Sequence, residues 1–226
     1  MADPRLIELP SDDQSEVAQT PDAAFYLDPA DPESWLASER VIRTLGSPAA
    51  WTPVQLWIGE ADVPLAERDR LHPVARADCS SSGHHPRLTQ AEIETAVDER
   101  GLLPFKPPAK WLAGEPMDTT NCLLATTFAK QAGKTVAFSL ALSRQIWCGG
   151  RDPEDLTTVM LAGAAAEIHP NAIEKALGLK SLRAELDRAS SEAASYGVTS
   201  LPTVRIGDAI FIGDAGLDEA AAKIHG

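Results

Sequence analysis

The sequence predicts an α/β fold in which a mixed β-sheet is interrupted by a large, all-helical insertion. Three observations lead to this prediction. Strand-like patterns occur only near the two ends of the chain, in residues 23–57 and 203–212. The long segment between them carries helical periodicity and helix-capping residues. The order strand, helix, strand, then a helical block, then strand, strand, helix requires a sheet with helices packed on both faces.

The overall composition is that of a globular protein, with 44% hydrophobic and 23% charged residues. The formal net charge of −13 would repel nucleic acid and anionic membranes, so we expect neither as a partner. No apolar run approaches the roughly 18 residues that a membrane span needs. Residues 1–21 lack the apolar core of a signal peptide and predict a disordered acidic tail. We therefore expect a cytoplasmic protein.

The three cysteines, Cys79, Cys122 and Cys148, include no C-x-x-C pair. Their odd number and wide spacing indicate no disulfide framework, which agrees with a reducing cytoplasm. Free cysteines of this kind are typical small buried residues. Cys79 also precedes His84 and His85, but this loop lacks the paired spacing of metal ligands, so we expect no metal.

The first strand–helix–strand unit begins with residues 23–28, an apolar run typical of a buried strand. Asp31 is suited to cap the helix that follows, and Pro32 fits its first position. Gly46 is expected to end that helix. Residues 51–57 alternate and predict a second strand, joined to the first by a right-handed crossover.

The middle of the chain, residues 61–180, is predicted to be the helical insertion. Thr89 and Glu92 form a capping-box pattern at the start of one helix, which Gly101 ends. Further helical patterns cover residues 121–131, 135–148, 153–168, 171–176 and 182–196. Residues 70–87 are polar and irregular, which indicates a loop.

Residues 181–226 are predicted to complete the sheet domain that residues 22–60 begin. The elements expected after the last insertion-like helix are strands over residues 203–206 and 209–212, joined by a Gly-Asp turn, and a helix over residues 217–224. The short turn between two strand-like runs is typical of a β-hairpin.

Several segments resemble the DsbA-like family, in its branch of 2-hydroxychromene-2-carboxylate isomerases and kappa-class glutathione transferases. The segments are Phe25 to Asp28 with Pro32, residues 92–107, Asn121 with the helix after it, Gly150 to Asp152, and residues 197–217. Their order and spacing carry the resemblance, more than any one motif. It implies a thioredoxin-like fold with a helical insertion, and a cis-proline at Pro202, which stands directly before a strand.

The resemblance places the catalytic positions at Asp31 and Ser34. Redox members carry C-P-x-C where this chain reads Asp31-Pro32-Glu33-Ser34, so disulfide exchange has no thiolate nucleophile here. The isomerases and transferases have a serine at the position of Asp31, which supports the thiolate of bound glutathione. A carboxylate about 4 Å from a thiolate repels it by about 4 kcal/mol at an effective dielectric constant of about 20, which raises the pKa of the thiol. Helix capping alone also accounts for Asp31, and a structural role accounts for Ser34.

The resemblance also implies a cofactor, glutathione or another low-molecular-weight thiol. Val198 to Leu201 would offer it backbone groups, and Pro202 would lie against it, with Asn121 also in the cofactor-binding set. Asp214 lies one residue before the position at which relatives receive the glutamyl amine, and is equally suited to cap a helix. The acidic, alanine-rich composition is typical of bacteria with GC-rich genomes, some of which use thiols other than glutathione.

Two functions follow from these residues. The first is an isomerase-like or glutathione-transferase-like enzyme for a small aromatic or hydrophobic substrate, with dithiol–disulfide oxidoreductase only a family label. The second is a catalytically degenerate binding module, which the aspartate at position 31 favours. An enzyme requires a pocket between Asp31 and Pro202, whereas a binding module would have it filled. Four tryptophans either line that pocket or pack in the core: Trp35, Trp57, Trp111 and Trp147. Kappa-class relatives are often dimers, so the resemblance is compatible with a homodimer.

Overall fold

The computed structural model describes residues 22–56 and 88–226, and over these residues four strands form one mixed sheet. The strand order is β2-β1-β3-β4. The strands are β1 (Ala23–Leu27), β2 (Ala50–Pro53), β3 (Thr203–Ile206) and β4 (Ala209–Ile212). β1 is parallel to β2 and antiparallel to β3, and β3 and β4 form the predicted hairpin. The predicted α/β fold with a mixed sheet is confirmed.

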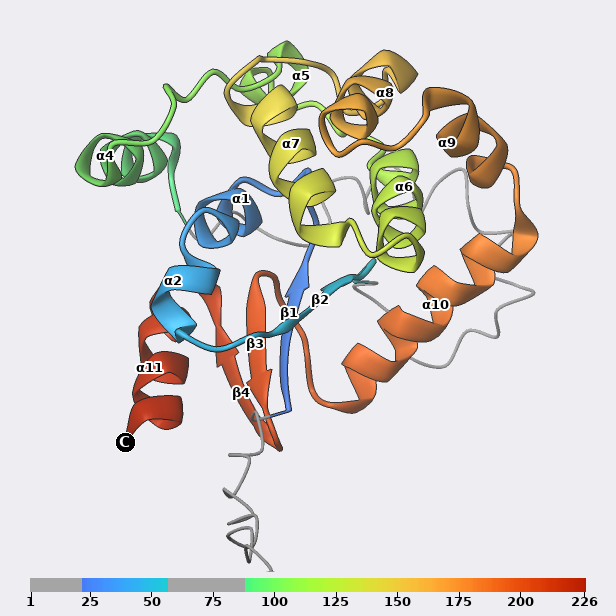
Figure 1. Cartoon of the computed structure of the whole chain (residues 1–226). Helices are drawn as coiled ribbons and strands as arrows, with labels where there is room; N and C mark the ends of the chain where they lie inside the picture. Colours follow the sequence, from blue (N-terminus) through green and yellow to red (C-terminus); the bar gives the residue numbers. More distant parts are fainter. Residues whose placement is uncertain (1–21, 57–87) are drawn as a thin grey trace, which may run out of the picture.

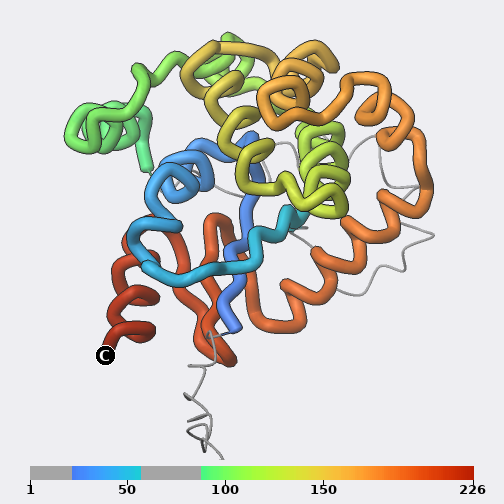
Figure 2. Tube along the Cα trace, viewed as in Figure 1, coloured from blue at the N-terminus to red at the C-terminus, as the bar shows by residue number. Residues whose placement is uncertain are grey.

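The helices between β2 and β3 form a block beside the sheet (Figure 1). They are α4 (Gln90–Arg100), α5 (Ala109–Leu112), α6 (Thr120–Gln131), α7 (Thr135–Trp147), α8 (Leu156–Ala165), α9 (Pro170–Leu177) and α10 (Lys180–Ser195). The capping box of Thr89 and Glu92 is present at the start of α4. In Figure 2 the blue and red ends of the chain build the sheet together, while the green to orange segments lie above it and, at α10, to its right in this view.

The single helix expected between Asp31 and Gly46 is wrong, because the chain forms two helices there. They are α1 (Pro32–Ser38) and α2 (Val41–Leu45), and Gly46 ends α2 in the left-handed conformation, with φ of 62°. The break at Glu39 and Arg40 changes the direction of the chain, so that Val41 and Leu45 both reach the core beneath the sheet.

The final helix, α11 (Gly213–His225), begins four residues earlier than predicted. β4 leads directly into it, and the Gly213 N–H donates to the Pro202 carbonyl at 2.7 Å. Ile212 is therefore the N-cap, and the role of Asp214 as a helix cap is wrong. Asp214 lies in the first turn of α11 instead.

The two faces of the sheet carry separate cores, as the alternation of side chains along a strand requires. Phe25 and Leu27 of β1 pack with α1, α2 and α11, whereas Ala24 and Tyr26 face the other way, toward Ala193 of α10. Within the described part of the chain, no helix is long and apolar enough to cross a membrane.

Of the tryptophans expected either in a pocket or in the core, Trp35 and Trp147 are core residues, and Trp111 is partly buried against the same core. Trp35 and Trp147 are fully buried, and each stacks with Phe105, at 5.9 and 6.1 Å between ring centroids. Trp111 meets Phe105 and Trp147 edge to face. Trp57, the predicted tail and the predicted loop over residues 70–87 lie outside the described residues.

Candidate active site at the start of α1

The end of β1 and the start of β3 lie at the same edge of the sheet. Tyr26 is paired with Thr203 in this antiparallel register, so two further residues along bring Asp28 level with Leu201. The Leu201–Pro202 peptide bond is cis. Because α1 follows β1 after a short turn, the start of α1 and Pro202 come together at this edge.

Asp31 caps α1, as the sequence predicts. Its backbone is extended, and its Oδ2 accepts a hydrogen bond from the Ser34 N–H at 2.7 Å. The residue is 8% exposed. The carboxylate is thus held over the first turn of the helix, close to the position where the resemblance expects a thiol.

Ser34 is fully buried one turn further along α1. Its Oγ accepts a long hydrogen bond, 3.4 Å, from the Asp28 N–H. The hydroxyl is therefore directed back toward the end of β1. Its predicted catalytic role is not tested by this geometry, but the contact shows how α1 is tied to the strand before it.

Asp28 is a buried acid at the end of β1, and it was not among the predicted catalytic residues. Its Oδ1 accepts from the Ala30 N–H at 2.8 Å, and its Oδ2 accepts from the Thr119 hydroxyl at 3.0 Å. Burial raises the pKa of Asp28 to about 7, and the nearby negative charge of Asp31 acts in the same direction. The raised pKa places the titration of Asp28 close to neutral pH.

The turn that carries Asp28 is fixed from the helical insertion. The Pro29 carbonyl accepts hydrogen bonds from the Ser143 hydroxyl at 2.9 Å and from the Trp147 indole at 3.2 Å. Thr119, just before α6, binds Asp28 itself. The insertion thus supplies the groups that position the acidic turn, and a sequence window around Asp28 does not contain them.

The two cysteines within the described residues are not nucleophile candidates. Cys122 is fully buried, its thiol contacts the Pro153 carbonyl at 3.3 Å, and burial raises its pKa well above the usual range. Burial also raises the pKa of Cys148 to about 11. Both therefore remain thiols at neutral pH.

The predicted cofactor-binding residues are distributed unevenly around this edge. Val198 and Leu201 are buried in the core with Tyr26, so only their backbone groups could face a ligand. Asn121 is exposed in the first turn of α6, two residues after Thr119.

Asp214 lies near Pro202 in space, because the N–H of the preceding residue, Gly213, donates a hydrogen bond to the Pro202 carbonyl. Its carboxylate, however, accepts hydrogen bonds from Arg100 at 2.5 and 3.1 Å and from Arg40 at 3.4 Å. An amine of a cofactor would have to compete with both guanidinium groups.

No group of three or more His, Cys, Asp or Glu residues in residues 22–56 and 88–226 is arranged to hold a metal ion. The Cys79–His85 segment lies outside those residues. The hydrogen bonds described above bring two carboxyl groups and two hydroxyl groups to this edge, those of Asp28, Asp31, Ser34 and Thr119.

No family model matches the chain, and no curated protein matches its sequence. Solved structures do match. A 2-hydroxychromene-2-carboxylate isomerase is 17% identical, with a TM-score of 0.67 over 89% of this chain and 93% of that one. A protein described as a probable DsbA oxidoreductase from Streptomyces coelicolor is 15% identical, with a TM-score of 0.62 over 89% and 88% of the two chains. The cytosolic disulfide reductase DsbM from Pseudomonas aeruginosa is 15% identical, with a TM-score of 0.54 over 89% and 96%.

These neighbours show the fold. The chain has the thioredoxin-like fold with a helical insertion that the isomerase and the DsbA-like proteins share. The predicted fold is confirmed at this level. Since the group contains both isomerases and oxidoreductases, the residues at the start of α1 have to carry any argument about chemistry.

Proposed function

We propose that the chain is an isomerase-like or transferase-like enzyme for a small aromatic or hydrophobic substrate. In this proposal the carboxyl of Asp28 accepts the proton of a bound thiol. The observation that carries the proposal is the carboxyl of Asp28, which is buried beside Asp31 and has a pKa of about 7. A proton-transfer group is most effective when its pKa lies near the working pH. Buried carboxyls with strongly perturbed pKa values are also concentrated at functional sites.

The contact with Thr119 supports such a role. A threonine hydroxyl both donates and accepts hydrogen bonds, so Thr119 can remain bound to Asp28 whether the carboxyl is ionised or protonated. Proton exchange at Asp28 then requires rotation of one hydroxyl and leaves the turn around Ala30 in place.

A thiol cofactor, glutathione or another small thiol, is part of this proposal. It would lie against Pro202 and the backbone of residues 198–201. A free thiol has a pKa of about 8.5, and an ordinary aspartate of about 3.9 is poorly matched to it. The pKa of Asp28 lies within about two units of the pKa of a thiol. Asp28 is therefore a better acceptor for the thiol proton than an ordinary aspartate.

The test is a calorimetric titration of the protein with reduced glutathione, using the wild type, Asp31→Ser and Asp28→Asn. We expect the wild type to bind and Asp31→Ser to bind more tightly, because a negative charge next to the thiol is removed. Asp28→Asn should still bind but should lose at least about a hundredfold in turnover of a small aromatic electrophile. Turnover equal to that of the wild type would refute the assigned role of Asp28.

A second candidate, a catalytically degenerate binding module, is favoured by one observation. Asp31 and Ser34, at the two positions that carry catalysis in relatives, are both buried, and both are engaged in hydrogen bonds to neighbouring backbone. A ligand that binds to the wild type without any turnover, with equal affinity for Asp28→Asn, would favour this function over the enzyme.

A further inference from the structure

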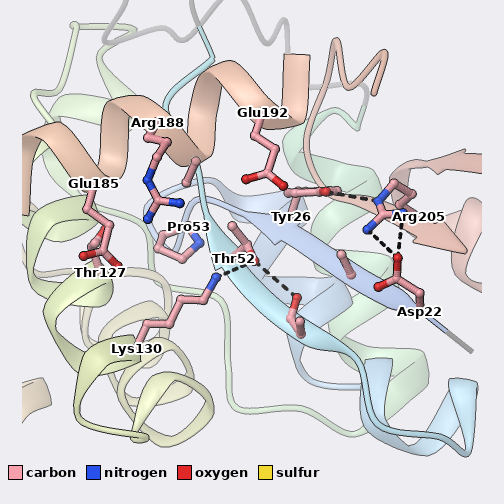
Figure 3. Close-up of a pocket in the computed structure, with 13 residues that line it drawn as sticks. Asp22, Tyr26, Thr52, Pro53, Thr127, Lys130, Glu185, Arg188, Glu192 and Arg205 are labelled. Atoms are coloured by element: carbon pink, nitrogen blue, oxygen red, sulfur yellow. Dashed lines mark hydrogen bonds and ion pairs between the residues drawn. The ribbon is translucent and has the colours of Figure 1, made fainter. Parts of the chain in front are cut away.

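A polar cavity lies on the opposite face of the sheet from α1 and α11. It has a volume of about 200 Å³, smaller than the roughly 300 Å³ at which pockets for drug-sized ligands begin. Its floor is formed by Ala24 and Tyr26 of β1 and Thr52 of β2, and α10 and the end of α6 form its walls (Figure 3). A ligand of this cavity must be small.

Short side chains create the space. The residues that line the cavity include five small ones from strands and helices that face one another: Ala24, Ala50, Thr52, Thr127 and Ala189. Larger side chains fill the same face of the sheet further along, where Leu56, Val198 and Leu201 pack around Tyr26. The cavity is therefore the part of this face that α10 covers but does not fill.

Two cationic side chains reach into the cavity without a carboxylate partner. Lys130 of α6 donates from Nζ to the Thr52 hydroxyl at 2.8 Å, which is a neutral partner. Arg188 of α10 points from the opposite wall toward the same part of the cavity (Figure 3). Among the residues that the structure describes, no carboxylate lies within ion-pair distance of either group. Burial lowers the pKa of Lys130, whereas the charges of Glu185 and Glu192 raise it.

An acidic side chain faces the same cavity further along α10. Glu192 extends from the helix over the sheet near Tyr26, one helical turn after Arg188, and makes no ion pair with it (Figure 3). Arg205 binds Asp22 at 3.2 Å and the Gly207 carbonyl at 2.7 Å. Glu185 also lines the cavity, and it accepts a hydrogen bond from the Gln131 amide, a neutral partner, at 2.5 Å.

We propose that this cavity binds a small zwitterion of the free amino acid class, with its carboxylate between Lys130 and Arg188 and its amine toward Glu192. Charges of both signs converge on one small volume, which fits a ligand that carries both signs. A simple anion would also meet the field of a chain with a net charge of −13, whereas a zwitterion carries no net charge. The site uses none of the residues of the proposed active site.

The test is calorimetric titration of the full chain with a panel of free α-amino acids, each compared with its N-acetyl derivative and its methyl ester. These derivatives keep only the carboxylate or only the amine. We expect saturable binding of at least one amino acid, with both of its derivatives weaker by about tenfold or more. Arg188→Gln, Lys130→Gln and Glu192→Gln should each weaken binding of the amino acid by about tenfold.

Two controls keep the test specific. Arg183→Gln changes an arginine of α10 that does not line the cavity, and it should bind like the wild type. Asp28→Asn should also bind like the wild type, which separates this site from the proposed active site. The three substituted cavity residues are exposed, so circular dichroism should show unchanged folding.

The proposal is overturned if no amino acid binds with a Kd below about 10 mM, if a derivative binds as well as its parent, or if Arg188→Gln has no effect.

Discussion

Asp28 shows how opposing local effects set the protonation of one residue. Burial raises the pKa of its carboxyl, the hydrogen bonds from the Ala30 amide and the Thr119 hydroxyl lower it, and the charge of Asp31 raises it. Burial is the largest of these effects, so the pKa settles near 7. The ionised form is therefore costly in the folded protein, and that cost can be measured as a dependence of stability on pH.

The first prediction concerns Asp28→Asn. Because the pKa of Asp28 is raised on folding, the native state binds the proton more tightly, and stability should fall as the pH rises from about 4 through about 7. A shift from 3.8 to about 7 corresponds to an upper limit of roughly 4 kcal/mol. Urea denaturation between pH 4 and pH 8 should show a steeper loss for the wild type than for Asp28→Asn. Parallel curves would contradict the raised pKa.

The second prediction concerns the cap at Asp31. Asp31→Ala should cost about 1 kcal/mol of stability, because the Ser34 N–H loses its acceptor, whereas Asp31→Ser should cost less because serine is also a good cap. Both variants remove a neighbouring negative charge, so both should lower the pKa of Asp28. Denaturation at pH 5 and pH 8 measures both effects. Equal destabilisation by alanine and serine would argue against the capping role.

At the scale of elements, α11 is joined to α4 and to the break between α1 and α2 through Asp214. This side chain is 13% exposed and is shared by Arg100 and Arg40. Its role in cofactor binding remains a prediction. Its structural role is to hold α11, α4 and the α1–α2 break together through these ion pairs. The ion pairs also give a physical reason for an acid in the first turn of a helix.

The third prediction is that Asp214→Asn lowers the free energy of unfolding by about 1–3 kcal/mol, because two partly buried guanidinium groups lose their shared acceptor. Asp218→Asn is the matched control. Asp218 is 67% exposed and, among the residues that the structure describes, pairs with Arg40 alone, so its loss should cost less than about 1 kcal/mol. If urea denaturation gives the same loss of unfolding free energy for the two variants, the partly buried ion pairs of Asp214 add no more stability than an exposed pair.

The fourth prediction concerns the contact between α8 and α9. A Cβ at Gly163 would meet the Cδ1 of Ile173 at 2.1 Å, and Ile173 is fully buried. Gly163→Ala should therefore cost about 1–3 kcal/mol through overpacking. Ile173→Val removes the opposing methyl group, so the double variant should lose less stability than the sum of the two single variants. Strict additivity would mean that the two positions do not press on each other.

The elements were predictable where local signals decide them. The cap at Asp31, the capping box of α4 and the hairpin of β3 and β4 all rest on residues close together in sequence. The break between α1 and α2 was not predictable in this way. It depends on Glu39, which binds Trp35 within the same helix and Arg144 from α7, more than 100 residues later. The early start of α11 similarly depends on the distant Pro202 carbonyl.

For the whole molecule, the mixed sheet and the helical insertion followed from the order of patterns along the chain. The candidate site followed only in part. Sequence reasoning identified Asp31 and Pro202, but it gave no weight to the chemistry of Asp28, because its pKa depends on burial beneath the insertion and on Thr119. An acid directly after a buried strand was the available signal.

Over residues 22–56 and 88–226, two separate polar regions lie on one small sheet. One lies at the edge where α1 begins, and the other lies under α10 on the face that carries Ala24 and Tyr26. The helical insertion contributes to both, through Thr119 in the first and through Lys130 in the second. Under both proposals, the insertion has a role in function as well as in stability.

The most direct test of this account is the pKa of Asp28, measured by NMR from the chemical shift of its side-chain carboxyl carbon between pH 3 and pH 9. Comparison with Asp28→Asn assigns the signal. The structure predicts a midpoint of about 7. A midpoint near the ordinary aspartate value of about 3.9 would contradict the account, because Asp28 would then be fully ionised at neutral pH and unsuited to proton exchange.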